Sequence, residues 1–96
     1  MKNPPKIYQK TLVRWSVRKI PANKGRADEY RLVMRDLDGI YSRKDGSPEY
    51  ILSNLRDNFF EIEKIIRQAE VEKKGLKIDF IRKFGRKFIN WVEIIS

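Results

Sequence analysis

The chain has no cysteine and no histidine among its 96 residues. Without histidine it lacks the side chain that titrates near neutral pH and most often serves as a general base. The absence of both residues excludes disulfides, zinc sites built on imidazole or thiolate, and nucleophiles paired with histidine. We therefore expect no enzyme activity, no metal and no cofactor.

Long apolar runs and glycine-rich loops are also missing. No apolar stretch approaches the ~20 residues that a membrane span requires, and residues 1–5 lack the apolar segment of a secretory signal. The five glycines do not form a phosphate-cradling loop of either standard spacing. We expect a cytoplasmic protein without a membrane span.

Two acidic pairs are the remaining candidates for a metal-dependent nuclease site. Asp36 and Asp38 are two residues apart, as are Glu61 and Glu63. Magnesium sites take one or two carboxylates together with substrate phosphates. The first pair fits a turn better, and the second lies within an expected helix, where side chains four residues away offer partners. We therefore predict that neither pair is catalytic.

Basic residues are in large excess, with 22 Lys and Arg against 13 Asp and Glu. A net charge of +9 attracts polyanions. Residues 1–47 hold twelve basic and five acidic residues, whereas residues 48–74 hold five and six. Because the excess is segregated along the chain, we expect it to form a binding surface. Nucleic acid, DNA or RNA, is the first expected partner, and an acidic protein surface is the alternative.

Alternating apolar and polar residues predict strands in the first half of the chain. The alternation runs through residues 10–20 and again through residues 29–37, with β-branched and aromatic side chains on the apolar phase. Residues 40–43 suit a short third strand after a turn at Asp38 and Gly39. We expect these segments to pair as an antiparallel sheet.

Apolar residues spaced by three and four predict helices in the second half. One helix is expected over residues 48–74, beginning at a Ser-Pro pair and ending before a glycine. A second helix is expected over residues 77–95, with a strand over residues 76–81 as the competing interpretation. The predicted fold is α+β: a two- or three-stranded antiparallel sheet followed by a long helix and a C-terminal helix packed on one face.

The domain organisation follows from these segments. Residues 1–9, with two prolines, are expected to form a flexible N-terminal arm, and residues 10–96 a single domain. The apolar stripe of the 48–74 helix keeps its spacing for almost three heptads, as a coiled-coil seam does. A homodimer through this helix is therefore expected, and the alternative is a monomer whose C-terminal helix covers the stripe. The stripe consists of Leu52, Leu55, Phe59, Ile62, Ile66 and Ala69.

The polar phase of the two predicted strands is rich in arginine. If the strands pair, these arginines share the face opposite the core, where guanidinium groups can bind phosphate or guanine edges. A merely solvated face is the alternative. The expected nucleic-acid contacts are Arg14, Arg18, Arg31, Arg35 and Arg43, with Lys10, Lys19, Lys24 and Arg26 on phosphates and Tyr41 stacking on bases.

The expected C-terminal helix is basic as well, with Lys77, Arg82, Lys83, Arg86 and Lys87 among aromatic residues. Such a helix can lie on a membrane surface or bind a partner. We expect its apolar stripe to pack on the domain instead. Its basic face would then extend the same polyanion-binding surface.

Overall fold

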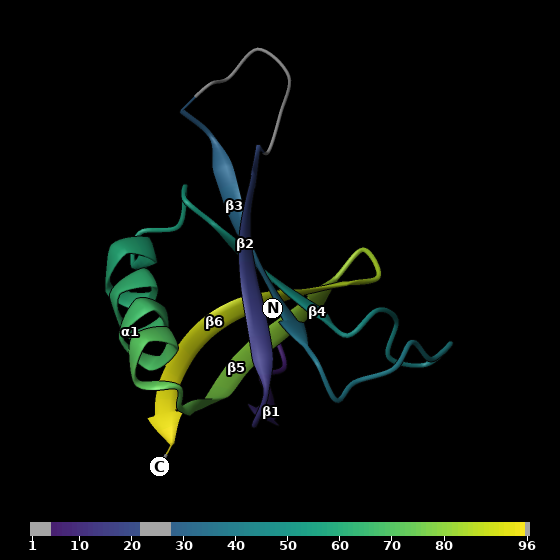
Figure 1. Ribbon diagram of the computed structural model, residues 1–96. Helices are drawn as coiled ribbons and strands as arrows, with labels where there is room; N and C mark the ends of the chain where they lie inside the picture. The colour runs from purple at the N-terminus through teal and green to yellow at the C-terminus, as the bar shows by residue number, and fades with distance from the viewer. Residues whose placement is uncertain (1–4, 22–27, 96) are drawn as a thin grey trace.

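A computed structural model describes residues 5–21 and 28–95 (Figure 1). Over these residues the chain forms six strands and one helix. In chain order these are β1 (Tyr8–Leu12), β2 (Trp15–Pro21), β3 (Tyr30–Asp36), β4 (Glu49–Ser53), α1 (Phe59–Glu72), β5 (Gly75–Lys83) and β6 (Arg86–Ile95). The six strands belong to one mixed sheet in the order β1-β5-β6-β4-β3-β2. All described neighbours pair antiparallel except β4 and β6, which are parallel.

The sheet curls strongly, because its two outermost strands are joined by only two residues. β1 and β2 lie at opposite ends of the strand order, yet only Val13 and Arg14 connect them. A flat six-stranded sheet would separate these strands by about 24 Å at a spacing of ~4.8 Å. The link from Leu12 to Trp15 spans at most about 11 Å. β1 and β2 are therefore two halves of one bent strand, and the sheet closes toward a barrel (Figure 1).

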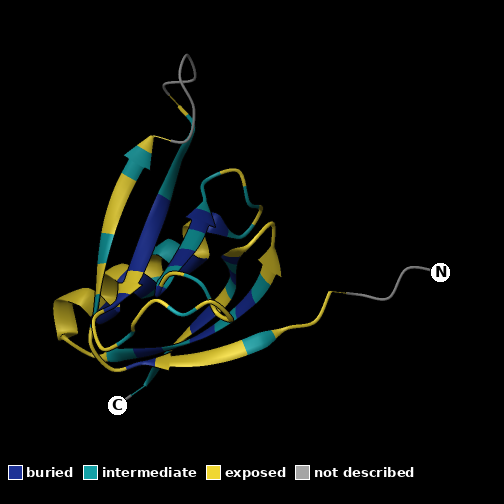
Figure 2. Ribbon diagram, turned by 90° about the vertical axis from the view of Figure 1, so that its right-hand side faces the viewer, coloured by how far each residue is buried: buried dark blue, intermediate teal, exposed yellow. Residues whose placement is uncertain are grey.

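The core lies inside this barrel and beneath α1. Along β4 and β5 buried positions alternate with partly exposed ones, and α1 turns its apolar side toward the sheet (Figure 2). The buried helix residues are Phe59, Ile62, Ile66 and Ala69. The strand residues of this core are Leu12, Leu32, Met34, Tyr50, Leu52, Leu76, Ile78, Phe80, Ile89 and Val92.

The helix predicted over residues 48–74 is wrong in its first part. Residues 49–53 form β4, and α1 begins only at Phe59. Instead of starting a helix, Pro48 accepts a backbone hydrogen bond from Asp36 N at 2.9 Å, which ties it to the end of β3. Pairing with β3 buries Tyr50 and Leu52, and this burial outweighs the local preference for helix.

The second predicted helix, over residues 77–95, is also wrong, and the competing strand interpretation is correct for residues 76–81. β5 and β6 form a hairpin that turns at Phe84 and Gly85, whose φ angles are 53° and 72°. Two residues with positive φ suit the tight turns of β-hairpins. The apparent spacing of three and four arises because the apolar phases of two strands are offset by this turn and by a bulge beside Asp79.

The first half of the chain is closer to expectation. The strand predicted over residues 29–37 is β3, and it pairs antiparallel with β2 as expected. The segment 10–20 is not one strand, because the chain bends at Val13 and Arg14. Residues 40–43 form no third strand, only an isolated bridge between Ser42 and Gly46. The α+β class is confirmed, but a sheet of two or three strands with two helices is not what forms.

Only part of the predicted N-terminal arm lies within the described residues. Residues 1–4 of the expected arm lie outside the described residues, and its last two residues belong to β1. Within residues 5–21 and 28–95 no helix has both the length and the apolar character needed to span a membrane.

Two leucines of the expected helical stripe should respond very differently to truncation. Leu52 is 0% exposed in β4, whereas Leu55 is 65% exposed in the turn that follows. We expect Leu52→Ala to lower the free energy of unfolding by about 2–5 kcal/mol and Leu55→Ala to change it by less than about 0.5 kcal/mol. Chemical denaturation of both variants measures the difference. Equal losses of unfolding free energy in the two variants would contradict the strand assignment of Leu52 and favour one continuous helix over residues 48–74.

Candidate nucleic-acid interface

The outer face of β2, β3 and β4 carries four charged residues that we call the arginine face: Arg18, Arg31, Arg35 and Glu49. The register places Arg18 opposite Val33, with Arg31 and Arg35 two residues to either side of Val33 on β3. Residues directly opposite in an antiparallel pair point to the same side, and diagonal neighbours lie about 7–8 Å apart. Three guanidinium groups therefore surround one valine on a single face.

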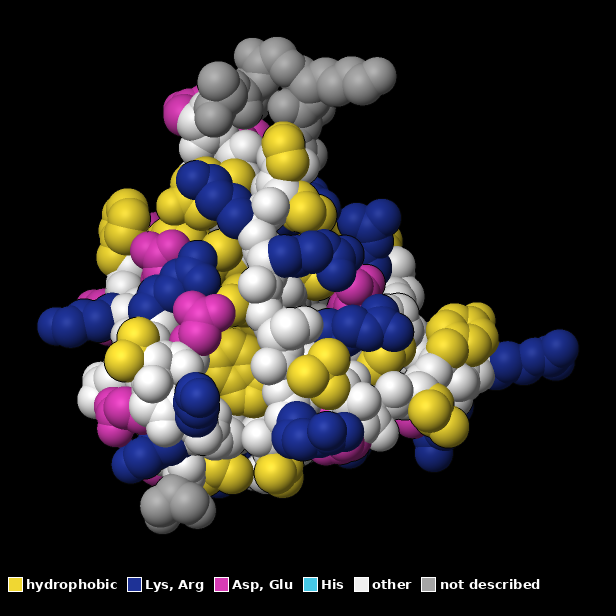
Figure 3. Space-filling view, in the orientation of Figure 1, with side chains coloured by type: hydrophobic (Ala, Val, Ile, Leu, Met, Phe, Trp, Pro, Cys, Tyr) yellow, Lys and Arg dark blue, Asp and Glu magenta, His cyan; other side chains and the backbone are white. Residues whose placement is uncertain are grey.

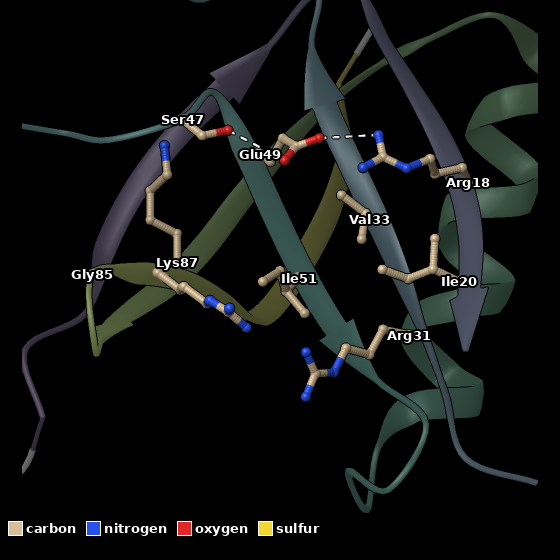
Figure 4. A pocket seen from close by; sticks show the side chains of 10 residues that line it. Arg18, Ile20, Arg31, Val33, Ser47, Glu49, Ile51, Gly85 and Lys87 are labelled. Carbon is tan, nitrogen blue, oxygen red and sulfur yellow. Dashed lines mark hydrogen bonds and ion pairs between the residues drawn. The ribbon is translucent and has the colours of Figure 1, made fainter. Parts of the chain in front are cut away.

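This face is hollowed between its arginines. The hollow has a volume of about 390 Å³, within the range of small-ligand pockets. Its floor is apolar, formed by Ile20, Val33 and Ile51, and Arg18 and Arg31 stand beside it (Figure 4). The other lining residues are Ser47, Glu49, Gly85, Arg86 and Lys87.

Glu49 partly neutralises the arginine face. Its Oε2 lies 3.0 Å from Arg18 Nη1 and 3.7 Å from Arg35 Nη1, and its Oε1 accepts a hydrogen bond from Ser47 Oγ at 3.3 Å. The two arginine side chains are about half exposed, and exposed ion pairs of this kind contribute only about 0–1 kcal/mol. Arg31 has no acidic partner within 4.0 Å in the part of the chain that the structure describes. A phosphate can therefore compete for all three guanidinium groups.

Basic side chains are not confined to one uniform patch. In the view of Figure 3, Lys and Arg side chains lie on both sides of β2, with Asp and Glu side chains between them. Net charge alone therefore does not mark a site on this surface. The distinctive feature of the arginine face is its geometry, namely three guanidinium groups around Val33 and an apolar hollow that two of them, those of Arg18 and Arg31, line.

Two of the predicted basic contacts lie away from this face. Arg14 lies at the bend between β1 and β2, and its Nε and Nη2 donate to Asp38 Oδ1 at 3.0 and 2.6 Å. This pairing raises the pKa of Arg14 and lowers the pKa of Asp38. Lys19 points to the core side of β2, where its Nζ lies 4.0 Å from the centroid of the Tyr30 ring.

The remaining predicted contacts also fall elsewhere. Lys10 lies in β1, at the far end of the strand order from β2. Tyr41 and Arg43 are exposed in the connection between β3 and β4, because residues 40–43 do not join the sheet. The predicted contacts Lys24 and Arg26 lie outside the described residues. The structure thus brings together Arg18, Arg31 and Arg35, and none of the other described candidates joins them.

The sequence interpretation missed the contribution of the β5–β6 turn. Gly85, Arg86 and Lys87 line the hollow beside the arginine face, although they were assigned to a separate helix. Phe84, at the tip of the turn, is 94% exposed. The Phe-Gly pair between two basic pairs is the feature that could have indicated a hairpin, because Gly tolerates positive φ.

The acidic pairs considered for metal binding form ordinary local structure. Asp36 Oδ1 accepts a hydrogen bond from the Asp38 backbone N–H at 3.0 Å, within the turn after β3. Glu61 lies in the first turn of α1, where its charge suits the helix dipole. No group of three or more acidic side chains suited to a metal ion occurs among the residues that the structure places.

Lys87 forms the border of the hollow next to Tyr50. Its Nζ lies 4.2 Å from the centroid of the Tyr50 ring, and both side chains are largely buried. Burial, together with the nearby Arg82 guanidinium, lowers the pKa of Lys87. Burial and the neighbouring Asp36 carboxylate raise the pKa of Tyr50 to about 12.

Comparison of the chain with protein-family models, with curated proteins and with solved structures gives no match.

The raised pKa of Tyr50 predicts a specific loss of stability in alkaline solution. The folded protein keeps Tyr50 protonated up to a pKa of about 12, whereas an unfolded chain ionises it near 10. The stabilisation from neutral Tyr50 is thus complete below pH 10 and is lost between pH 10 and 12. Denaturation midpoints of the wild type should fall more steeply across this window than those of Tyr50→Phe. Parallel curves for the two proteins would contradict the assignment.

Proposed function

We propose that the protein binds nucleic acid through the arginine face and the adjoining β5–β6 turn, and that it does so without catalysis. The observation that carries this proposal is the convergence of Arg18, Arg31 and Arg35 around Val33, beside an apolar hollow that Arg18 and Arg31 line. Guanidinium groups pair with phosphate oxygens through two parallel hydrogen bonds. The apolar floor between them offers contact area to the sugar or base of the same strand.

The path of the strands supports the proposal. With β1 and β2 counted as one bent strand, the barrel has five strands in the order first, second, third, fifth, fourth, and the fourth returns to pair with the first. The third and fifth strands are parallel, and α1 lies between the third and fourth along the chain. This connectivity is that of the OB-fold, a five-stranded Greek-key barrel.

OB-folds bind oligonucleotides and oligosaccharides on the face of their second and third strands and on two adjoining loops. In this chain those strands are β3 and β4, which carry Arg31, Arg35 and Glu49. One of the loops corresponds to the β5–β6 turn, and the other to the connection between β2 and β3, which contains Lys24 and Arg26. The likeness concerns topology alone, and one fold serves many functions. It therefore supports the arginine face as the site without identifying the ligand.

The β5–β6 turn favours a single-stranded ligand. Phe84 exposes almost its whole ring, and Lys83 and Arg86 lie on either side of Phe84 and Gly85 in the turn. Aromatic side chains next to basic residues bind single strands because unpaired bases stack on the ring while phosphates meet the cations. We expect single-stranded DNA or RNA to bind more tightly than duplex.

The alternative partner is an acidic protein surface, which the same arginines would contact. Displacement of such a partner by oligonucleotides separates the two cases. Association of two copies, which would join two arginine faces, also stays a prediction. The helix expected over residues 48–74 to mediate it forms only as α1, and the stripe residues of α1 are buried in the core.

Removal of two guanidinium groups from the arginine face should weaken oligonucleotide binding. We expect Arg18→Ala with Arg31→Ala to reduce affinity for a single-stranded oligonucleotide at least tenfold and to flatten its salt dependence by about one to two units of slope. The matched control is Lys64→Ala with Arg67→Ala on the exposed side of α1, which removes the same charge. Fluorescence anisotropy over a range of salt concentrations measures both. Equal losses in the two double variants would show that only net charge matters.

Phe84 should contribute by stacking, and its contribution can be isolated with a second exposed phenylalanine. We expect Phe84→Ala to cost about 1–3 kcal/mol of single-strand binding. Phe60, 75% exposed on α1, provides the control, because Phe60→Ala removes the same ring away from the proposed site. Duplex binding should change little in either variant. An unchanged single-strand affinity in Phe84→Ala would remove the turn from the site.

A further inference from the structure

The interior of the barrel changes from apolar to charged at one end. The inner positions of β3, β5 and β6 are apolar over most of their length and then become Asp36, Arg82 and Lys87. Lys10 of β1 and Tyr50 of β4 lie at the same end. All five line one hollow of about 630 Å³ that no residue of α1 lines, and we call it the barrel mouth. The connection between β3 and β4 forms its remaining wall.

The barrel mouth contains a buried cation without an acidic partner. Lys87 is only 8% exposed, and no carboxylate lies within 4.0 Å of its Nζ in the described part of the chain. Three carboxylates also line the mouth, and each has another partner. Asp45 pairs with Arg82 at 2.8 Å, Asp38 pairs with Arg14 at 2.6 Å, and Asp36 accepts the N–H of Asp38. A buried ammonium is costly unless it is paired. The mouth is thus built to receive a negative charge at Lys87.

The wall beside this cation is aromatic. The rings of Tyr8 and Phe80 stack with centroids 5.6 Å apart, and Tyr50 meets Phe80 edge to face at 5.1 Å. Lys87 lies over the ring of Tyr50, and the guanidinium of Arg82 lies 4.7 Å from the centroid of Tyr8. Ligand pockets commonly combine such apolar walls with a few fixed polar groups, and barrel mouths are among their usual places.

We propose that the barrel mouth binds a small organic anion, consisting of a planar ring that bears a phosphate or a carboxylate. The anionic group pairs with Lys87 Nζ, and the ring lies against the wall formed by Tyr8 and Phe80. This site lies on the inner side of the sheet, whereas the arginine face lies on its outer side. It goes beyond nucleic-acid binding and does not depend on it.

The test is a titration of isotopically labelled full-length protein followed by NMR. The probes are adenosine monophosphate and benzoate, with adenosine and inorganic phosphate as the ring-only and anion-only arms. We expect adenosine monophosphate, benzoate or both to shift amide signals of β1, of residues 37–48 and of residues 80–87. Adenosine alone and inorganic phosphate alone should each bind at least tenfold more weakly. The two ring-bearing probes distinguish a phosphate ligand from a carboxylate ligand.

The variants place the anion at Lys87. We expect Lys87→Met, which keeps the length of the side chain, to weaken binding of the better probe at least tenfold, and Lys87→Arg to retain most of it. Lys83→Met removes the same charge at an exposed position of the same hairpin and should leave affinity unchanged. Tyr8→Ala, on the rim of the mouth, tests the ring contact independently if Lys87→Met fails to fold. It should weaken the ring-bearing probes and not phosphate.

Three outcomes would overturn the proposal: no shifts at millimolar probe, shifts that persist in Lys87→Met, or shifts confined to the arginine face. Arg18→Ala with Arg31→Ala should leave probe binding at the mouth intact. Failure of nucleic-acid binding and failure of the barrel-mouth site are therefore separate results.

Discussion

The two-residue link between β1 and β2 is the constraint on which the rest of the structure depends. Because Val13 and Arg14 cannot bridge the edges of a flat sheet, one bent strand must pair with β5 through its first half and with β3 through its second. The bend is held by local contacts: Leu37 N donates to Arg14 O at 3.0 Å, and Trp15 Nε1 donates to Lys74 O at the end of α1 at 3.0 Å. Closure leaves few free strand edges and separates an interior from an outer face.

Alternation along the closed strands then determines where the charges lie. The phase that buries Leu32 and Met34 inside the barrel turns Arg31 and Arg35 outward, and the register brings Arg18 between them. Three like charges around one valine repel one another, and Glu49 on the next strand relieves this repulsion without removing the positive excess. The arrangement suits a surface that exchanges weak internal ion pairs for contacts with phosphate.

The sequence predicted β2 and β3 because charged residues mark one phase of each strand, as Arg31 and Arg35 do on either side of Val33, so a period of two is visible. It failed for β4, where Tyr50, Ile51 and Leu52 are all apolar and no alternation remains. Ile51 is apolar although it points outward, because it forms the floor of the hollow on the arginine face. The hairpin of β5 and β6 was missed for a related reason, since outward-facing Ile81 and Phe88 interrupt the alternation. Short apolar runs of this kind do not distinguish strand from helix by periodicity, and the partner strands that decide the outcome are distant in sequence.

Lys87 lies at the border between the arginine face and the barrel mouth. It lines both the hollow of the arginine face and the barrel mouth, and it extends past the beginning of β4 toward Ser47 (Figure 4). Its position follows from the hairpin register, which sets it opposite Arg82 on the inner side of β5. The ammonium group itself lies over the ring of the core residue Tyr50, so its charge belongs to the barrel mouth.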